Sequence, residues 1–269
     1  MDIIERTDEW RESYLGWRRT SELRGTELGA RYPFVENARA PFKPLGRALP
    51  MLNLALISSA GAFVDGSVPF DVERVGGDVS FREIPTLVEA GDLAWAARGY
   101  DPAAVLKDMN AQAPLERLFE FAGNGIIGQL CPVFWSFCGF IPNAGRLVDE
   151  TLPLLVERVK RYGVQAALLI PASSLCHQTM SLAARALEMG GVPTMLIAVD
   201  RERCELTRPP RAVYYKGEFG SVAGQPDWPE HQRRILDEAL RLLEPTDQPS
   251  VRNLVVELET TVEMSRGEK

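Results

Sequence analysis

Residues 165–180 read QAALLIPASSLCHQTM, and this stretch decides the fold. The continuous apolar run from Ala166 to Ile170 is too short for a helix and ends at Pro171, which is typical of a buried parallel strand running into a loop. After the loop, apolar residues recur three and four positions apart and indicate an amphipathic helix that ends at Gly190 and Gly191. A strand, a loop and a helix in this order predict an α/β fold with a mainly parallel sheet flanked by helices.

A single cysteine, Cys176, stands where this helix is expected to begin, and His177 and Gln178 follow it. The turn of a strand-loop-helix unit lies at the carboxyl edge of the sheet, where open α/β folds bind ligands. The positive end of the helix is expected to lower the pKa of the Cys176 thiol from its usual value of about 8.5. His177 is expected to share the mouth of the same pocket. The alternative is an inert cysteine, because free cysteines are among the most buried residue types.

Other short apolar runs extend the predicted sheet. Residues 52–57 and 194–199 have the pattern of buried strands, and residues 146–162 have that of the helix before the central strand. This alternation predicts right-handed parallel crossovers, with Rossmann- or flavodoxin-like layers in one or two lobes. The expected divisions are a helical arm and linker at 1–48, an α/β domain at 49–245 and a tail at 246–269. Within the tail, residues 254–258 alternate apolar and polar and predict an edge strand or an oligomer contact.

The composition restricts the class of protein. With 45% hydrophobic and 25% charged residues, 269 residues are enough to bury a large core. A net charge of −7 argues against a nucleic-acid partner. No run approaches the roughly 18 apolar residues that span a bilayer, and the acidic start does not resemble a signal peptide, so we expect a cytoplasmic protein without membrane contact. The irregular spacing of the four cysteines predicts reduced thiols and no metal site.

Further stretches carry candidate substrate-binding residues. Ser58 and Ser59 follow the first strand, and their turn of small residues offers backbone donors to an anion such as a carboxylate. Arg82 is suited to binding a carboxylate, and Ser136 lies in an aromatic segment where it can line a pocket. The alternative for Ser58 and Ser59 is a turn without a ligand. For Arg82 it is a solvated ion pair with Glu83, and for Ser136 it is a place in an aromatic core. Gln178 completes the candidate binding set.

Five phrases, in order along the chain, resemble the selenoprotein B family of glycine, sarcosine, betaine and D-proline reductases, and most of all its D-proline branch. They are ALISSAG at 55–61, GDVSFREIP at 77–85, WSFCGFIPN at 135–143, PxSxxCHQ at 171–178 and RPPRA at 208–212. The resemblance runs from about residue 41 to residue 243. It implies an oxidoreductase of amino-acid metabolism that acts on a small substrate carrying a carboxylate or an amine.

The resemblance also implies roles for particular residues. In that family a selenocysteine stands three residues before the cysteine; its selenolate attacks the carbon next to an amine, the C–N bond breaks reductively, and the cysteine resolves the adduct as a selenide-sulfide. Ser173 stands at the selenocysteine position and Cys176 at the resolving cysteine. A hydroxyl cannot form a dichalcogenide with Cys176. The expected protein is therefore a selenium-free, thiol-dependent reductase with Cys176, Ser173 and His177 as catalytic residues.

The resemblance bears on partners and alternatives as well. It implies a pyruvoyl-bearing partner chain, and a homo-oligomer is the other option; no cofactor is expected on this chain. The alternative functions are a non-redox cysteine-dependent lyase or isomerase, and an accessory or binding subunit without catalysis. Ser173 favours the accessory subunit, as does Arg98, because the run at 97–101 lacks a histidine that the family usually carries. Serines rather than a second thiol at residues 58–59 disfavour a cofactor-free racemase.

Overall fold

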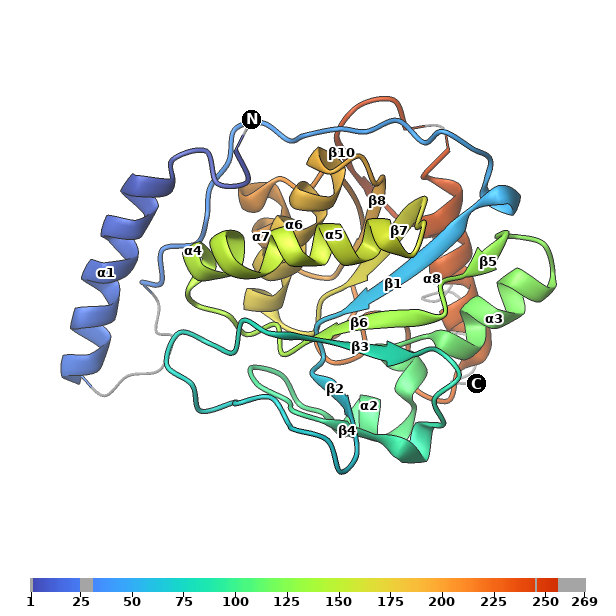
Figure 1. Ribbon diagram of the computed structural model, residues 1–269, viewed down its shortest axis with the longest axis horizontal. Coiled ribbons are helices and arrows are strands. Elements are labelled where there is room, and N and C mark those ends of the chain that lie inside the picture. The colour runs from blue at the N-terminus through green and yellow to red at the C-terminus, as the bar shows by residue number, and fades with distance from the viewer. Residues whose placement is uncertain (1, 25–30, 245, 256–269) are drawn as a thin grey trace, which may run out of the picture.

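The computed structural model describes residues 2–24, 31–244 and 246–255, which form a central sheet with helices on both faces (Figure 1). The strands of the large sheet are β1 (Asn53–Ser58), β3 (Phe81–Pro85), β5 (Gln129–Leu130), β6 (Val133–Phe137), β7 (Ala166–Ile170), β8 (Thr194–Ala198), β9 (Arg211–Tyr214) and β10 (Ser250–Asn253). The strands β2 (Ala62–Val64) and β4 (Leu93–Trp95) form a separate antiparallel pair. The helices are α1 (Thr7–Arg24), α2 (Ala103–Lys107), α3 (Leu115–Gly123), α4 (Ala144–Arg146), α5 (Leu152–Arg161), α6 (Ser174–Met189), α7 (Arg201–Thr207) and α8 (Pro229–Arg241).

The large sheet has the order β10-β9-β8-β7-β1-β6-β3, with β5 paired to the start of β1. All of its pairs are parallel except β3 with β6, so β3 is an antiparallel edge strand. The mainly parallel α/β fold predicted from the sequence is therefore confirmed. β7 spans the residues predicted for it, β1 is shifted by one residue at both ends, and β8 ends one residue earlier than predicted.

Alternate residues of β1 pack on opposite faces of the sheet. Ala55 and Ile57 belong to a core with residues of α5 and α6, whereas Leu54 and Leu56 belong to a core with residues of α3 and α8. All six residues of β1 are buried, as expected for a central parallel strand covered by helices on both sides. Removing a leucine side chain of this kind from water contributes about 2 kcal/mol.

Further elements lie at the two ends of the described chain. α1 lies at one end of the molecule (Figure 1, blue), and residues 31–48 run as an extended linker without a strand of their own. The edge strand in the tail is β10, which begins earlier than the predicted residues 254–258 and pairs with β9. Residues 256–258 lie outside the described part of the chain. Within the described ranges, no helix combines the length and apolarity needed to cross a bilayer.

The strand order places a topological switch at β1. After β1 the chain forms β3 and β6 on one side of β1 and later returns to form β7 on the other side. In open α/β sheets a crevice forms outside the carboxyl ends of the strands at such a point, and ligands bind there. The carboxyl ends of β1, β6 and β7 are therefore where a functional site is expected.

Candidate functional site

Ser59 joins the three strand ends at the switch point. Its backbone N–H donates to the Ile170 carbonyl at 3.0 Å, and its own carbonyl accepts from the Gly139 N–H at 3.0 Å. Its hydroxyl accepts from the Ala172 N–H at 3.0 Å. In this conformation the Ser59 hydroxyl is engaged in holding the turn after β7 against β1, and its substrate-binding role stays a prediction.

Gly139 allows the turn after β6 to approach this junction. A Cβ atom at Gly139 would lie 2.4 Å from the Cβ of Ser59 and 3.0 Å from the sulfur of Cys176. Real Cβ atoms do not approach a neighbouring Cβ so closely. Glycine is required here for contact with the thiol, and the backbone at Gly139 forms one wall around Cys176.

Cys176 lies in the first turn of α6, as the sequence predicted, and Ser173 caps that helix. The Ser173 side chain accepts from the Cys176 N–H at 3.2 Å, which satisfies one of the free donors at the helix start. The same hydroxyl lies 3.0 Å from the Cys176 sulfur and donates to it. The structure therefore places the residue at the selenocysteine position in direct contact with the thiol.

The Cys176 thiol is completely buried, and its pKa is raised, not lowered. Burial is the largest influence on this pKa, because it penalises the thiolate. Hydrogen bonds involving Ser173 and Ser59 and the backbone of Ala172 act in the opposite direction. The prediction of a lowered pKa is wrong for this conformation: the helix N-terminus is present, but loss of water outweighs it.

The sequence prediction missed two residues near this thiol, Tyr100 and Cys138. Tyr100 packs against the cluster of Ala60, Ala172 and Cys176, and its hydroxyl donates to the Ala60 carbonyl at 2.6 Å. Cys138 faces Ala60 across an antiparallel bridge. Burial, followed by the charge of an ionised Cys176, raises the pKa of Cys138 to about 12.

Both missed residues lie in stretches that the resemblance to the reductase family already singles out. Cys138 is part of WSFCGFIPN at 135–143, and Tyr100 is part of the run at 97–101. The available signal was a thiol within a phrase shared with the family, but the aromatic residues around it favoured an ordinary core.

His177 does not share the surroundings of the thiol as predicted. Its Nε2 accepts from the backbone N–H groups of Val199 and Asp200 at 3.1 and 3.2 Å. The proton is therefore on Nδ1, which donates to the Ser173 carbonyl at 2.7 Å. Burial lowers the pKa of His177 to about 4. Both ring nitrogens are bound to backbone, so the imidazole connects the start of α6 to the end of β8.

Gln178 is also directed away from the strand ends. Its side-chain oxygen accepts from the Val35 N–H at 2.7 Å, and its nitrogen donates to the Tyr32 hydroxyl at 2.9 Å. Gln178 is fully buried in this arrangement. In this conformation the amide fastens the amino-terminal linker to α6, and its substrate-binding role stays a prediction.

Three of the predicted binding residues occupy one row across the sheet. Ser58 pairs with Ser136, and Ser136 pairs with Arg82. Ser58 and Ser136 are completely buried, and the Ser136 hydroxyl is without a hydrogen-bond partner. The Ser58 hydroxyl has only a long contact, 3.4 Å, from the Ala60 N–H. Two neighbouring hydroxyls at the carboxyl edge thus retain unused donors.

Arg82 is occupied elsewhere and does not reach toward the thiol in this conformation. Its guanidinium donates to the carbonyls of Val68 and Pro69 and to the Ser80 hydroxyl. It also stacks over the Phe70 ring, 4.2 Å from the ring centre. The expected ion pair with Glu83 is not what holds it.

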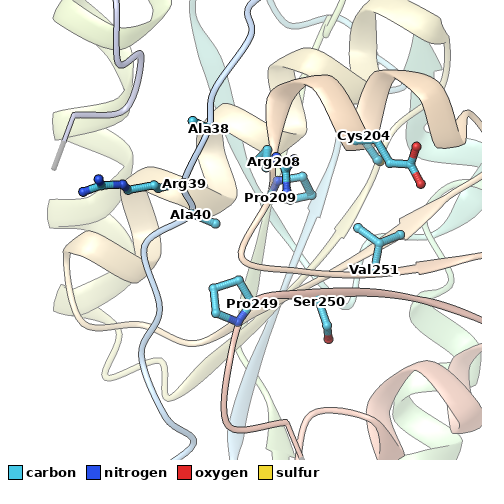
Figure 2. Close-up of a pocket in the computed structure, with 10 residues that line it drawn as sticks. Ala38, Arg39, Ala40, Cys204, Arg208, Pro209, Pro249, Ser250 and Val251 are labelled. Atoms are coloured by element: carbon cyan, nitrogen blue, oxygen red, sulfur yellow. The ribbon is translucent and has the colours of Figure 1, made fainter.

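Surface pockets of different sizes lie outside this buried centre. A pocket of about 290 Å³ adjoins the segments that cover Cys176. Asp101, the residue after Tyr100, lines it, as does Phe219, whose ring contacts the ring of His177. A larger pocket, of about 660 Å³, lies at the amino edge of the sheet between α7, β10 and the linker (Figure 2). Arg39 at its rim points away from the other labelled residues. Among the described residues, no group of His, Cys, Asp and Glu side chains is arranged to hold a metal ion.

Comparison with known proteins finds similar chains in amino-acid reductase complexes. The D-proline reductase subunit gamma of Acetoanaerobium sticklandii is 32% identical over 200 residues, which are 74% of this chain and 81% of that protein. The sarcosine reductase complex component B subunit beta of Peptoclostridium acidaminophilum is 26% identical, and the glycine reductase complex component B subunit gamma of Symbiobacterium thermophilum is 24% identical. These matches cover 66% and 65% of this chain but 41% of each relative. No family model and no solved structure matches the chain.

Proposed function

Because the chain belongs to the selenoprotein B family of glycine, sarcosine, betaine and D-proline reductases, we propose that it is a selenium-free, thiol-dependent reductase subunit that cleaves a C–N bond. One observation carries the proposal: a hydroxyl, Ser173, donates to the Cys176 sulfur at 3.0 Å in the first turn of a helix at the topological switch point. A hydrogen bond to sulfur and a helix N-terminus both favour the thiolate.

In this proposal Cys176 is the nucleophile and Ser173 is a positioning residue. The Ser173 hydroxyl cannot replace a selenolate, because its pKa is far above neutral, but it can stabilise the negative charge of a neighbouring sulfur. His177 acts only through Ser173, whose carbonyl it binds at 2.7 Å. It fixes the backbone from which the capping hydroxyl projects.

The substrate that fits is a small amino acid with a carboxylate. Ser58 and Ser136 offer two adjacent buried hydroxyls with unused donors, and a carboxylate accepts from such donors. Their strand ends carry the turns that surround Cys176. The proposal places the carboxylate on these hydroxyls and the carbon next to the amine near the sulfur. D-Proline, glycine, sarcosine and betaine, named by the family, are the compounds to test.

Access to Cys176 requires movement of the segments that cover it. Gly99 packs so closely on Phe140 that a Cβ at Gly99 would lie 2.3 Å from the ring. On the other side, the Gly220 N–H donates to the Ala172 carbonyl at 2.9 Å. We place the entrance between these segments, at the pocket that Asp101 and Phe219 line. Opening there restores water or substrate to the thiol and lowers its pKa, because burial is what raises it. A partner chain, such as the pyruvoyl-bearing one that the family implies, can stabilise the open form.

The test compares Cys176→Ser with Cys131→Ser in the complex isolated from cells through a tag on this chain. Cys131 is the matched control because it is buried and reduced but lies before β6, at the opposite end of that strand from Gly139. With a dithiol as electron donor, Cys176→Ser is expected to abolish C–N cleavage of the four compounds, measured as released amine or, for the cyclic D-proline, as the ring-opened amino acid, whereas Cys131→Ser retains it. Equal turnover in wild type and Cys176→Ser would remove Cys176 from the mechanism.

A second function is favoured by one observation, the complete burial of Cys176 together with its raised pKa. A subunit that has lost catalysis would keep such a thiol closed. Modification of the native complex with a thiol reagent across a range of pH separates the two. A single cysteine that reacts with a lowered pKa in the presence of substrate supports the reductase, and four unreactive thiols support an accessory subunit.

A further inference from the structure

We propose that Cys138 is the second thiol of this site and that it forms a disulfide with Cys176 during turnover. The inference rests on the proposed function. Cys138 supplies the second redox-active group, which a serine at position 173 cannot provide. A reductive cleavage needs two electrons. With Ser173 unable to be oxidised, a lone Cys176 cannot provide them, so a second thiol must lie within reach.

The backbone brings Cys138 to Cys176 through two shared neighbours. The first is Ala60, which faces Cys138 across a bridge and packs against Cys176. The second is Gly139, directly after Cys138, whose missing Cβ would stand 3.0 Å from the Cys176 sulfur. Tyr100 lies near both sulfurs, and each of them raises the pKa of its hydroxyl, although less than burial does.

A weak contact, beside a backbone hydrogen bond with Phe140, holds the Cys138 sulfur in its present orientation. Its sulfur donates to the Ala96 carbonyl at 3.3 Å, in the segment that we expect to move when the site opens. A thiol is a weak donor, so this contact costs little to break. Movement of residues 96–101 therefore both admits the substrate and frees the Cys138 side chain to turn toward Cys176.

The remaining cysteines are placed where they cannot serve. Cys131 lies between β5 and β6, near the start of β6 rather than its carboxyl end. Cys204 lies in α7 and is completely buried, and it lines the pocket at the amino edge of the sheet (Figure 2). Cys138 and Cys176 are thus the cysteines that the fold gathers at the switch point.

The proposed chemistry balances within these two residues and the substrate. Attack of the Cys176 thiolate on the carbon next to the amine forms a C–S bond and breaks the C–N bond, and the departing amine takes a proton. Attack of the Cys138 thiolate on the Cys176 sulfur then forms the S–S bond and breaks the C–S bond. The carbon takes the electron pair and a second proton. The substrate gains two electrons, both thiols are oxidised, and an external dithiol reduces the disulfide for the next cycle.

The experiment uses diamide, a dithiol oxidant, on the native full-length chain without any substrate. After oxidation, free thiols are alkylated in denaturant and the digested protein is analysed by mass spectrometry. We expect one linked pair of peptides, carrying Cys138 and Cys176, whose mass is lower by two hydrogen atoms. Cys138→Ser and Cys176→Ser are expected to lose this pair, and Cys131→Ser is expected to keep it.

The outcomes separate this inference from the proposed function. Because the linked peptides are identified in the wild-type protein, the result does not depend on the folding of any variant. Free Cys138 after complete reaction, or a link between other cysteines, overturns the pairing even if the complex reduces its substrate. If the linked Cys138–Cys176 peptides form but no substrate is reduced, the proposed reductase function is contradicted and the pairing of the two cysteines still holds.

Discussion

Hydrogen bonds of Ser173 to Cys176 and to His177 join the residues of the phrase PxSxxCHQ into one folded motif. The Ser173 side chain caps α6, its carbonyl accepts from His177, and its hydroxyl donates to Cys176. From the sequence, the placement of Cys176 at the start of a helix could be predicted, but the cap by Ser173 was not predicted. The tautomer and the backbone partners of His177 could not be predicted, because they come from the end of β8, which is distant in the sequence.

The first prediction at the residue scale concerns the pH dependence of His177. Its pKa in the folded protein is about 4, below the ordinary value of 6.5, so between these values the unfolded chain binds more protons than the folded one. The neutral ring therefore stabilises the fold at neutral pH, and this contribution is lost as the pH falls through that window. It amounts to about 3 kcal/mol for a fully buried group.

The measurement is urea unfolding of wild type and His177→Gln over that pH range. The variant is expected to be less stable at neutral pH, and the difference in free energy of unfolding should narrow toward pH 4. His231→Gln is the control, because burial also lowers the pKa of His231 but this ring lies on α8. A difference for His177→Gln that stays constant with pH would contradict the assignment.

At the scale of the element, α6 is a central helix and not an amphipathic surface helix. Residues 175–188 are all buried, because the linker at 31–48 and the start of the chain cover the side that would otherwise face solvent. Arg185 is the main link. Its guanidinium donates to the carbonyls of Ile3, Arg39 and Arg208 at 2.8, 2.6 and 2.9 Å, and to the carbonyl of Asp2 at 3.0 Å.

The second prediction is that Arg185→Met releases the amino-terminal arm. The change leaves several part-buried carbonyls without their donor and should cost about 3 kcal/mol of stability. Limited proteolysis of the native protein is expected to cut residues 2–40 faster than in wild type. Arg161→Met, which removes an exposed arginine of α5, should leave the cleavage rate unchanged. Equal cleavage in both variants would show that other contacts hold the arm.

The same elements show why the sequence predicted only part of the sheet. β1, β7 and β8 are continuous apolar runs buried on both faces, and such runs identify a central strand without knowledge of its partners. β3 and β9 are not predicted from the sequence, since their strand pairing depends on neighbours far along the chain. β6 is not predicted as a strand, because the large aromatic residues Phe134, Trp135 and Phe137 occupy both of its faces. They hide the alternation of side-chain type by which most strands are recognised.

At the scale of the whole molecule, the amino edge of the sheet is held by a buried ion pair opposite the proposed site. Glu188, near the end of α6, accepts from the Arg211 guanidinium at the start of β9 and from the Lys43 N–H of the linker. It also accepts from the Thr194 N–H at 2.8 Å, at the start of β8. Both charged side chains are almost without exposed surface. One carboxylate therefore joins a helix, two strands and the linker.

The last prediction separates this structural centre from the reactive one. Glu188→Ala leaves the guanidinium of Arg211 buried without its counter-charge and should cost about 3–5 kcal/mol in free energy of unfolding. The double change Glu188→Leu with Arg211→Met should cost less than Glu188→Ala, because a buried ion pair can be replaced by apolar residues of similar volume with little loss. Glu157→Ala, which breaks the exposed pair with Arg161, should change stability by about 0.5 kcal/mol or less.

Urea unfolding gives these costs, and diamide oxidation of the same variants reports on the other edge of the sheet. The Cys138–Cys176 link should form in every variant that remains folded, because Glu188 and Arg211 contact the amino ends of β8 and β9 whereas the thiols lie at the carboxyl ends of β1, β6 and β7. Loss of the link in the folded double variant would mean that the two edges are coupled through α6, which carries Glu188 near one end and Cys176 near the other. That helix would then transmit strain from the linker to the thiol.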